Sequence, residues 1–153
     1  MQPSPYRVAS QWLAARAVED VMSLKWFGRE REATRCGRLG NLPLYYMPIT
    51  SGGAWIVTPN GDKAKGVIGP PWGRGTSVPF DPKVIAKIKW EGPGAAPARK
   101  EIEGAGSKLV QYWRLKAERN RKYLDAKGVD TNIPSVTKLE QRADDMEAAL
   151  SHL

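Results

Sequence analysis

The chain has 153 residues, of which 41% are apolar, and this is enough for one domain with a modest hydrophobic core. Its net charge is +8, from 24 basic and 16 acidic residues. Cys36 is the only cysteine and His152 the only histidine, so an intramolecular disulfide is excluded. Ser-His-Asp, Cys-His and Cys/His zinc chemistry would all depend on that histidine beside the C-terminus. No apolar run is long enough to span a membrane, so no membrane partner is expected.

The first predicted element is a helix that begins near Ser4 and reaches Leu24. Ser4 fits the N-cap, and Pro5 fits the first turn, where a missing N–H costs nothing. Apolar residues then recur at spacings of three and four, at Tyr6, Ala9, Leu13, Ala17, Val21 and Leu24. Trp12 lies on a second apolar side, so the helix is expected to pack between two surfaces or against another chain. The acid-free start is also typical of an organellar transit peptide.

Residues 28–42 are charged and punctuated by glycine. Arginines alternate with Glu30 and Glu32, which indicates a solvated helix end with local ion pairs, or alternatively a binding patch. The region 1–42 is therefore predicted as an N-terminal helix with a charged connector.

Residues 43–91 form a Gly/Pro-rich β region. Short β-type runs at 44–49, 54–59 and 65–69 predict an antiparallel meander, and Asn60-Gly61 is a strong hairpin signal. Residues 84–90 are either a fourth strand or a short helix that Pro82 starts. The loop 69–75 carries Trp72 and Arg74 at its tip, where they either bind a ligand or, for the tryptophan, cover a small β core.

Residues 92–105 are predicted to be a linker, and 106–153 a pair of helices. In the first helix, 106–127, one stripe is apolar and the opposite side mixes cations with aromatic rings. The apolar stripe holds Leu109, Val110, Trp113, Ala117 and Leu124. The opposite side holds Lys108, Tyr112, Leu115, Lys116, Arg119, Lys122 and Tyr123.

A surface of cations and aromatic rings suits phosphates and exposed bases. The residues predicted to contact nucleic acid are therefore Lys108, Tyr112, Lys116, Arg119, Lys122 and Tyr123, with Trp72 and Arg74 as secondary contacts. The alternative is that these cations are neutralised by acidic residues of the same chain. Residues 106–127 hold seven basic and two acidic groups, whereas 128–153 hold two and five, so the basic helix could bind its acidic neighbour instead.

The last helix is predicted at about 135–151. Thr137 and Glu140 have the spacing of a capping box. Leu139, Ala143, Met146, Leu150 and Leu153 repeat at four and three, but two heptads are too short to establish a coiled coil, so packing on its own domain is favoured. The competing interpretation is a partner or homo-oligomer interface formed by Trp12, Trp26, Leu139, Met146 and Leu150.

Two enzymatic alternatives use carboxylates. Glu101-Ile102-Glu103, preceded by Thr76-Ser77, resembles part of the ADP-ribosyltransferase pattern, in which one glutamate stabilises a developing sugar cation. A metal-dependent nuclease would use Asp62, Asp81 and Glu91 with Lys83 or Lys89. Neither is preferred, and no cofactor or resident metal is predicted.

One resemblance covers the start of the chain. The segment PYRVASQWLAAR, residues 5–16, resembles N-terminal segments of small proteins of tailed bacteriophages. A helical arm, a Gly/Pro-rich β middle and a helical tail are together similar to phage virion accessory proteins. The resemblance implies a viral setting, with a location in the host cytoplasm or the virion, and it implies no activity.

The sequence thus predicts an α+β fold, with a small antiparallel meander packed with one N-terminal and two C-terminal helices. The predicted function is a non-enzymatic, basic binding or assembly protein that contacts nucleic acid or a nucleic-acid-containing particle. A structural subunit that assembles through apolar helical arms is the second prediction, and a carboxylate-dependent enzyme is the third.

Overall fold

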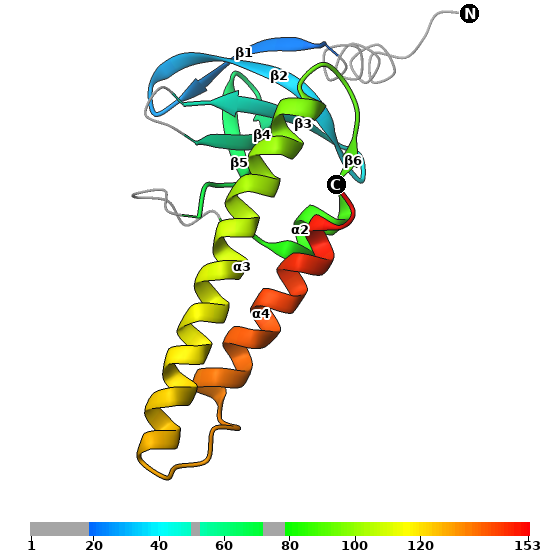
Figure 1. Cartoon of the computed structure of the whole chain (residues 1–153). Coiled ribbons are helices and arrows are strands. Elements are labelled where there is room, and N and C mark those ends of the chain that lie inside the picture. Colours follow the sequence, from blue (N-terminus) through cyan, green and yellow to red (C-terminus); the bar gives the residue numbers. More distant parts are fainter. Residues whose placement is uncertain (1–18, 50–52, 72–78) are drawn as a thin grey trace, which may run out of the picture. The chain divides into compact units, whose positions relative to one another are not determined.

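The computed structural model describes residues 19–49, 53–71 and 79–153, which form an α+β structure (Figure 1). It divides into two compact units. The barrel unit contains the described residues up to Pro79 and Lys87–Ala98, and the helical unit contains Phe80–Ala86 and Arg99–Leu153. The predicted first helix falls mostly on residues 1–18, outside the described residues, and so does the segment 5–16 on which the predicted viral resemblance rests.

The barrel unit is built from five consecutive strands, each antiparallel to the next: β1 Val21–Trp26, β2 Arg29–Leu39, β3 Leu42–Pro48, β4 Ala54–Asn60 and β5 Lys63–Ile68. β1 also pairs in parallel with β5 at Lys25 and Lys63, and the Lys25 N–H donates to the Asp62 carbonyl at 2.8 Å. The sheet therefore closes on itself. The predicted meander is confirmed as β3, β4 and β5, and Gly61, with a φ of 65°, turns the Asn60-Gly61 hairpin.

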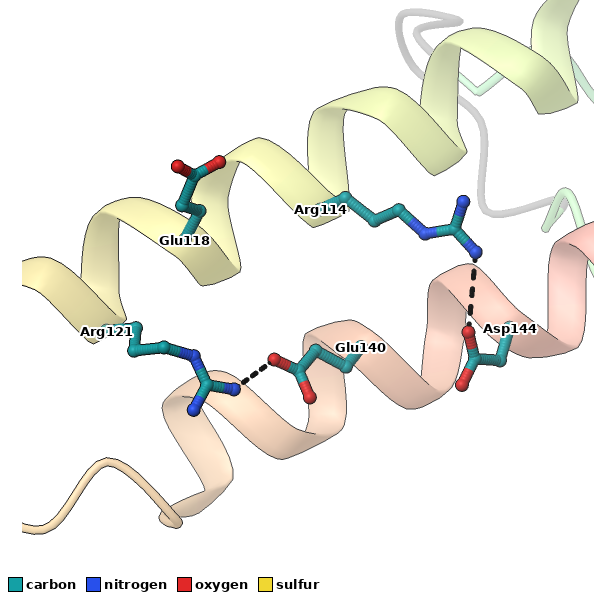
Figure 2. Close-up of a pocket in the computed structure, with 5 residues that line it drawn as sticks. All are labelled: Arg114, Glu118, Arg121, Glu140 and Asp144. Atoms are coloured by element: carbon teal, nitrogen blue, oxygen red, sulfur yellow. Dashed lines mark hydrogen bonds and ion pairs between the residues drawn. The ribbon is translucent and has the colours of Figure 1, made fainter.

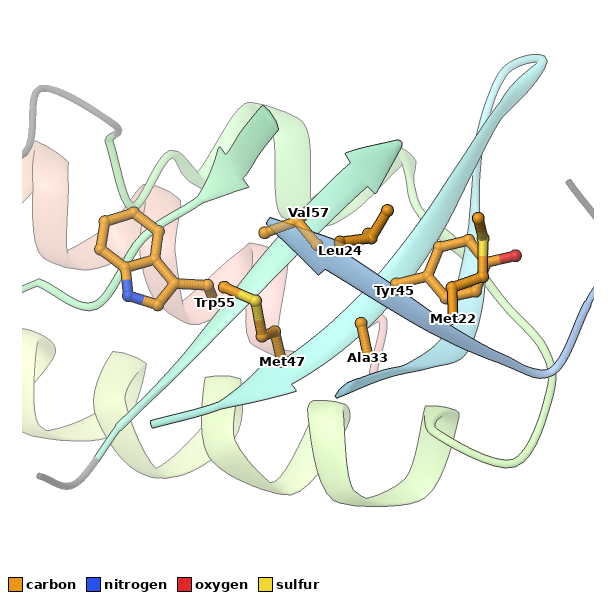
Figure 3. Close-up of a cluster of buried hydrophobic side chains, with 7 residues drawn as sticks. All are labelled: Met22, Leu24, Ala33, Tyr45, Met47, Trp55 and Val57. Atoms are coloured by element: carbon orange, nitrogen blue, oxygen red, sulfur yellow. The ribbon is translucent and has the colours of Figure 1, made fainter. Parts of the chain in front are cut away.

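Alternate residues of these strands fill the barrel. The buried cluster consists of Met22, Leu24, Ala33, Tyr45, Met47, Trp55 and Val57, with Trp26, Ile49 and Ala64 packed against it (Figure 3). In Figure 3, Trp55 and Met47 lie towards one end of the cluster, and Tyr45 and Met22 towards the other. The Tyr45 hydroxyl donates to the Glu19 carbonyl at 2.7 Å, so this polar group is satisfied.

The prediction of a helix through Leu24 followed by a charged connector is wrong from residue 21 onwards. Val21 and Leu24 fit a helical spacing, but VMSLKW also alternates, with Met22 and Leu24 buried and Ser23 and Lys25 exposed. The 28–42 segment is mostly β2 and the turn that follows it. Its charges are compatible with a strand because they alternate with inward positions and pair across it, as Lys25 does opposite Glu30.

The predicted alternatives for 84–90 are both partly present. The helix α2, Pro82–Lys87, begins after Asp81, whose carboxylate accepts the Lys83 N–H at 2.9 Å and caps the first turn. It is followed by β6, Lys89–Trp90, which pairs with β2 at Gly37 and Arg38.

The predicted linker 92–105 is also wrong, because the helix α3 already begins at Ala95 and continues to Ala126. Gly92, with a φ of 99°, and Gly94 lie against the β2 backbone, and the Gly94 N–H donates to the Arg35 carbonyl at 2.7 Å. Pro97 is tolerated because it lies in the first turn, where the N–H has no intrahelical partner. The Gly/Pro composition therefore serves a tight turn rather than a linker.

The helical unit pairs α3 with α4, Pro134–Leu150. Ala117, Val136 and Leu139 form a buried cluster that Trp113 and Leu124 cover, which confirms the apolar stripe of the first helix. Met146 is fully buried, so the expectation that the last helix packs on its own domain is confirmed. The predicted capping box is wrong: the N-cap is Ile133 with Pro134 after it, and Thr137 donates to the Ile133 carbonyl at 3.2 Å instead.

Candidate functional site

The candidate site is the side of α3 that faces away from the α3–α4 cluster, and we call it the outer α3 stripe. It consists of Lys108, Tyr112, Leu115, Lys116, Arg119, Lys122 and Tyr123, all of which are exposed. The helix places them within about one third of its circumference, over about 22 Å at 1.5 Å per residue. Tyr112 and Tyr123 are 52% and 60% exposed, so both residues are open to solvent.

Cations and rings are interleaved along the outer α3 stripe. The Lys116 ammonium lies 5.9 Å from the centroid of the Tyr112 ring, and the Lys127 ammonium lies 4.6 Å from that of Tyr123. Lys122 forms an ion pair of 3.1 Å with Glu118, four residues earlier on the same helix. Lys108, Lys116 and Arg119 form no ion pair with the rest of the described chain. Their positive charge is therefore available to a ligand.

The acidic helix α4 pairs with a different side of α3. Arg114 forms an ion pair with Asp144 at 3.4 Å, and Arg121 pairs with Glu140 (Figure 2). Arg114 also pairs with Glu147 at 2.7 Å. The hydrogen bond to Glu147 is the main reason that the pKa of Arg114 is raised. These ion pairs cross a shallow groove lined by Arg114, Glu118, Arg121, Glu140 and Asp144. The ion pairs connect α3 with α4. Because they are exposed to solvent, each contributes little by itself to the stability of the helix pair.

The internal alternative is therefore correct in part. The acidic helix does bind the basic one, but it uses two arginines that sequence reasoning did not select. The signal for them is spacing: Arg114 and Arg121 are seven residues apart on one side of α3, and their acidic partners recur at four and three along α4. The predicted nucleic-acid residues on α3 lie outside these contacts.

The predicted partner interface is largely packed inside the chain where the structure describes it. Met146 is fully buried and Leu139 is 8% exposed, while Leu150 is partly buried and its methyl groups lie close to Gly106 of α3. Trp26 is partly buried, with its ring centroid 5.0 Å from that of Trp55. Trp12 lies outside the described residues.

The remaining predicted residues are not brought together. Trp72 and Arg74 lie outside the described residues, as do Thr76 and Ser77. Glu101 and Glu103 lie in α3 rather than after a strand, and two residues apart on a helix they project in nearly opposite directions. No ADP-ribosyltransferase-like strand and E-x-E arrangement is thus present in the described part of the chain.

The carboxylates proposed for a nuclease are each engaged locally. Asp62 pairs with Lys25 at 3.1 Å, which holds the pKa of Asp62 below its usual value. Glu91 pairs with Arg38 at 2.7 Å and with Arg35 at 3.6 Å. Asp81 caps α2 as described above. The described residues contain no cluster of three or more His, Cys, Asp or Glu side chains that could hold a metal ion.

Cys36 is fully buried in the barrel unit, and burial raises the pKa of its thiol to about 12 from an ordinary value of 9.0. Between these values the unfolded state loses its thiol proton while the folded state keeps it, so stability falls as pH rises. We expect the unfolding free energy of the wild type to fall more steeply than that of Cys36→Ala from about pH 9 upwards, by up to about 4 kcal/mol.

This prediction is checked by denaturant unfolding of both proteins at a series of pH values. Parallel pH profiles for the two proteins would contradict it. A thiol reagent at neutral pH provides a second readout, because the native thiol is expected to react only after unfolding.

No protein family, curated protein or solved structure matches this chain. Within the described residues, no helix is both long and apolar enough to cross a membrane. The chemistry of the outer α3 stripe is therefore the main guide to function.

Proposed function

We propose that this protein is a non-enzymatic, basic binding protein that contacts nucleic acid through the outer α3 stripe. The observation that carries the proposal is the separation of charge on α3. Arg114 and Arg121 pair with Glu140, Asp144 and Glu147 of α4, whereas Lys108, Lys116 and Arg119 are exposed and have no acidic partner among the described residues. A row of exposed cations without acidic partners creates a positive potential that attracts an anionic partner.

The spacing supports a polyanion rather than a small anion. The cations extend from Lys108 to Lys122, over about 21 Å along the helix, so a single phosphate or carboxylate would reach only one or two of them. Exposed tyrosines between the cations give a face on which bases can stack. An acidic protein would use the cations but would leave Tyr112 and Tyr123 without a specific role.

The first test is the salt dependence of binding to labelled DNA and RNA. If Lys108, Lys116, Arg119 and Lys122 each neutralise one phosphate, the slope of log affinity against log salt is about −3.6 for duplex DNA. Affinity should then fall about 150-fold between about 50 and 200 mM salt. Apolar assembly would survive this change, and light scattering on the same samples would report it as a mass above the monomer.

The specific prediction concerns Arg119→Glu, which is expected to lower affinity for nucleic acid by about tenfold or more and to reduce the salt slope by about one. The matched control is Arg142→Glu, which makes the same change of charge at an exposed position of α4. If the two variants lose affinity equally, the attraction is only that of net charge and the outer α3 stripe is not the site. If the wild type binds no nucleic acid at low salt, the proposed function is wrong.

A further inference from the structure

The second unusual surface of this protein is the tip of the β1–β2 hairpin. Trp26 pairs with Arg29 across the hairpin, so Phe27-Gly28 is a two-residue loop, with φ values of 51° and 76°. Positive φ at both positions is the type I′ geometry, in which asparagine, aspartate or glycine is favoured first. Phenylalanine has no local hydrogen bond to offset this conformation. Folding alone therefore gives no reason for an aromatic ring at this position.

The ring of Phe27 is held out in solvent. It is 79% exposed, and its centroid lies 5.0 Å from that of Trp26 in an edge-to-face arrangement of 77°. Trp26 in turn lies 5.0 Å from Trp55, which is 3% exposed and belongs to the barrel core. A run of three aromatic rings thus connects the core to the hairpin tip. This support orients the Phe27 ring while most of its surface stays free.

Two guanidinium groups share the side of the hairpin that carries Trp26. The register places Arg29 opposite Trp26 and Arg31 opposite Leu24, on the same side of β2 as the buried Ala33. Arg29 is exposed, and the Nε of Arg31 is buried with no hydrogen-bond partner in the described part of the chain. A buried donor without a partner is uncommon. Neither Arg29 nor Arg31 forms an ion pair with another described residue, so the charge of both guanidinium groups is not neutralised there.

The acidic residues of the hairpin lie on its other side. Glu30 faces Lys25 and Glu32 faces Ser23, because successive residues of a strand alternate between its two sides. Along the strands the side with Trp26 faces the barrel core at Leu24 and Ala33. At the hairpin tip it carries the free aromatic surface together with the exposed Arg29 and the partly buried Arg31, and no carboxylate from β1 or β2. This combination fits an unpaired base together with its phosphate.

We infer that the hairpin tip is a stacking site for single-stranded nucleic acid, with a base on Phe27 and its phosphate on Arg29 and Arg31. The inference rests on the proposed function for the class of partner and adds that the partner has unpaired bases. A duplex keeps the faces of its bases stacked, so it would reach the arginines but not the ring. The hairpin tip thus distinguishes single strands from duplexes, whereas the outer α3 stripe provides positive charge for the phosphates of either.

The test uses Phe27→Asn in the full-length protein. Asparagine tolerates positive φ, so the variant is expected to be at least as stable as the wild type in thermal unfolding. Its affinity for a labelled oligothymidine of about twelve nucleotides should fall about tenfold, while its affinity for a duplex of equal length stays within about twofold. Phe27→Tyr, which keeps the ring, should retain single-strand affinity.

The outcomes separate this inference from the proposed function. If Phe27→Asn binds the single strand like the wild type while Arg119→Glu does not, the stacking site is wrong and the proposed function stands. Equal losses of single-strand and duplex affinity in Phe27→Asn would also reject stacking. If the wild type binds neither probe, the proposed function is wrong and the inference falls with it. Binding of Phe27 to a protein partner instead would appear as nucleic-acid affinities unchanged by Phe27→Asn.

Discussion

Gly37→Ala is expected to destabilise the barrel unit by about 2–3 kcal/mol, because an added Cβ has no space at this position. It would collide with the Lys89 carbonyl oxygen and lie 3.2 Å from the Trp90 Cα. Both are backbone atoms of β6, so no side-chain rotation can relieve the contact. β6 would have to move away from β2, which weakens the pairing at Gly37 and Arg38. Denaturant unfolding followed by circular dichroism measures the loss.

The matched control is Gly104→Ala, the same chemical change inside α3. No neighbouring atom of the described residues lies within 4 Å of a Cβ at Gly104, and alanine restricts the unfolded chain more than glycine does. This variant should therefore gain about 0.5–1 kcal/mol. Opposite signs for the two alanines are the expected result, and a Gly37→Ala protein as stable as the wild type would show that β6 is not held closely against β2.

Leu24→Ala is expected to cost about 3 kcal/mol, within the range for truncating a buried leucine. Leu24 is fully buried in the barrel cluster, where the missing atoms would leave a cavity that the closed sheet cannot readily fill. Urea unfolding of the two proteins would give the difference.

The comparison for Leu24→Ala is Leu42→Ala, since Leu42 begins β3 and is 43% exposed. The unfolding free energy of Leu42→Ala should be lower than that of the wild type by less than about 1 kcal/mol. Similar losses for both leucines would contradict the assignment of Leu24 to the barrel core.

The sequence predicted those parts of the fold where local signals agree with tertiary structure. β3 to β5 are short β-type runs bounded by turn residues, and the stripe of α3 with Ala117 has helical spacing over several turns. Residues 21–39 were predicted as a helix end and a charged connector instead of β1 and β2. The segment that holds Val21 and Leu24 fits the period of a helix as well as that of a strand, and Arg and Glu have low strand propensity by themselves. β2 is a strand because β1, β3 and β6 pair with it, which is information that no local window contains.

The candidate site was predictable in its composition but not in its relation to the acidic helix. Helical spacing alone places Lys116 and Arg119 on one side and Ala117 on the other, and the structure agrees. The spacing of Arg114 and Arg121 matches that of the acids of α4, but spacing alone does not select them, because the contact depends on how the two helices are rotated against each other. The sequence also gave no reason to select Phe27, because the feature that distinguishes this residue is its positive φ.

The order of the barrel strands has a consequence for how quickly the chain can find this structure. Every antiparallel pair among β1 to β5 joins neighbours in sequence, so each hairpin closes a short loop and loses little chain entropy. The parallel bridge between Lys25 and Lys63 is different, since it joins the two ends of this series. Pairing can therefore proceed from hairpin to hairpin and leave the bridge for last, which favours rapid folding for a barrel of this kind.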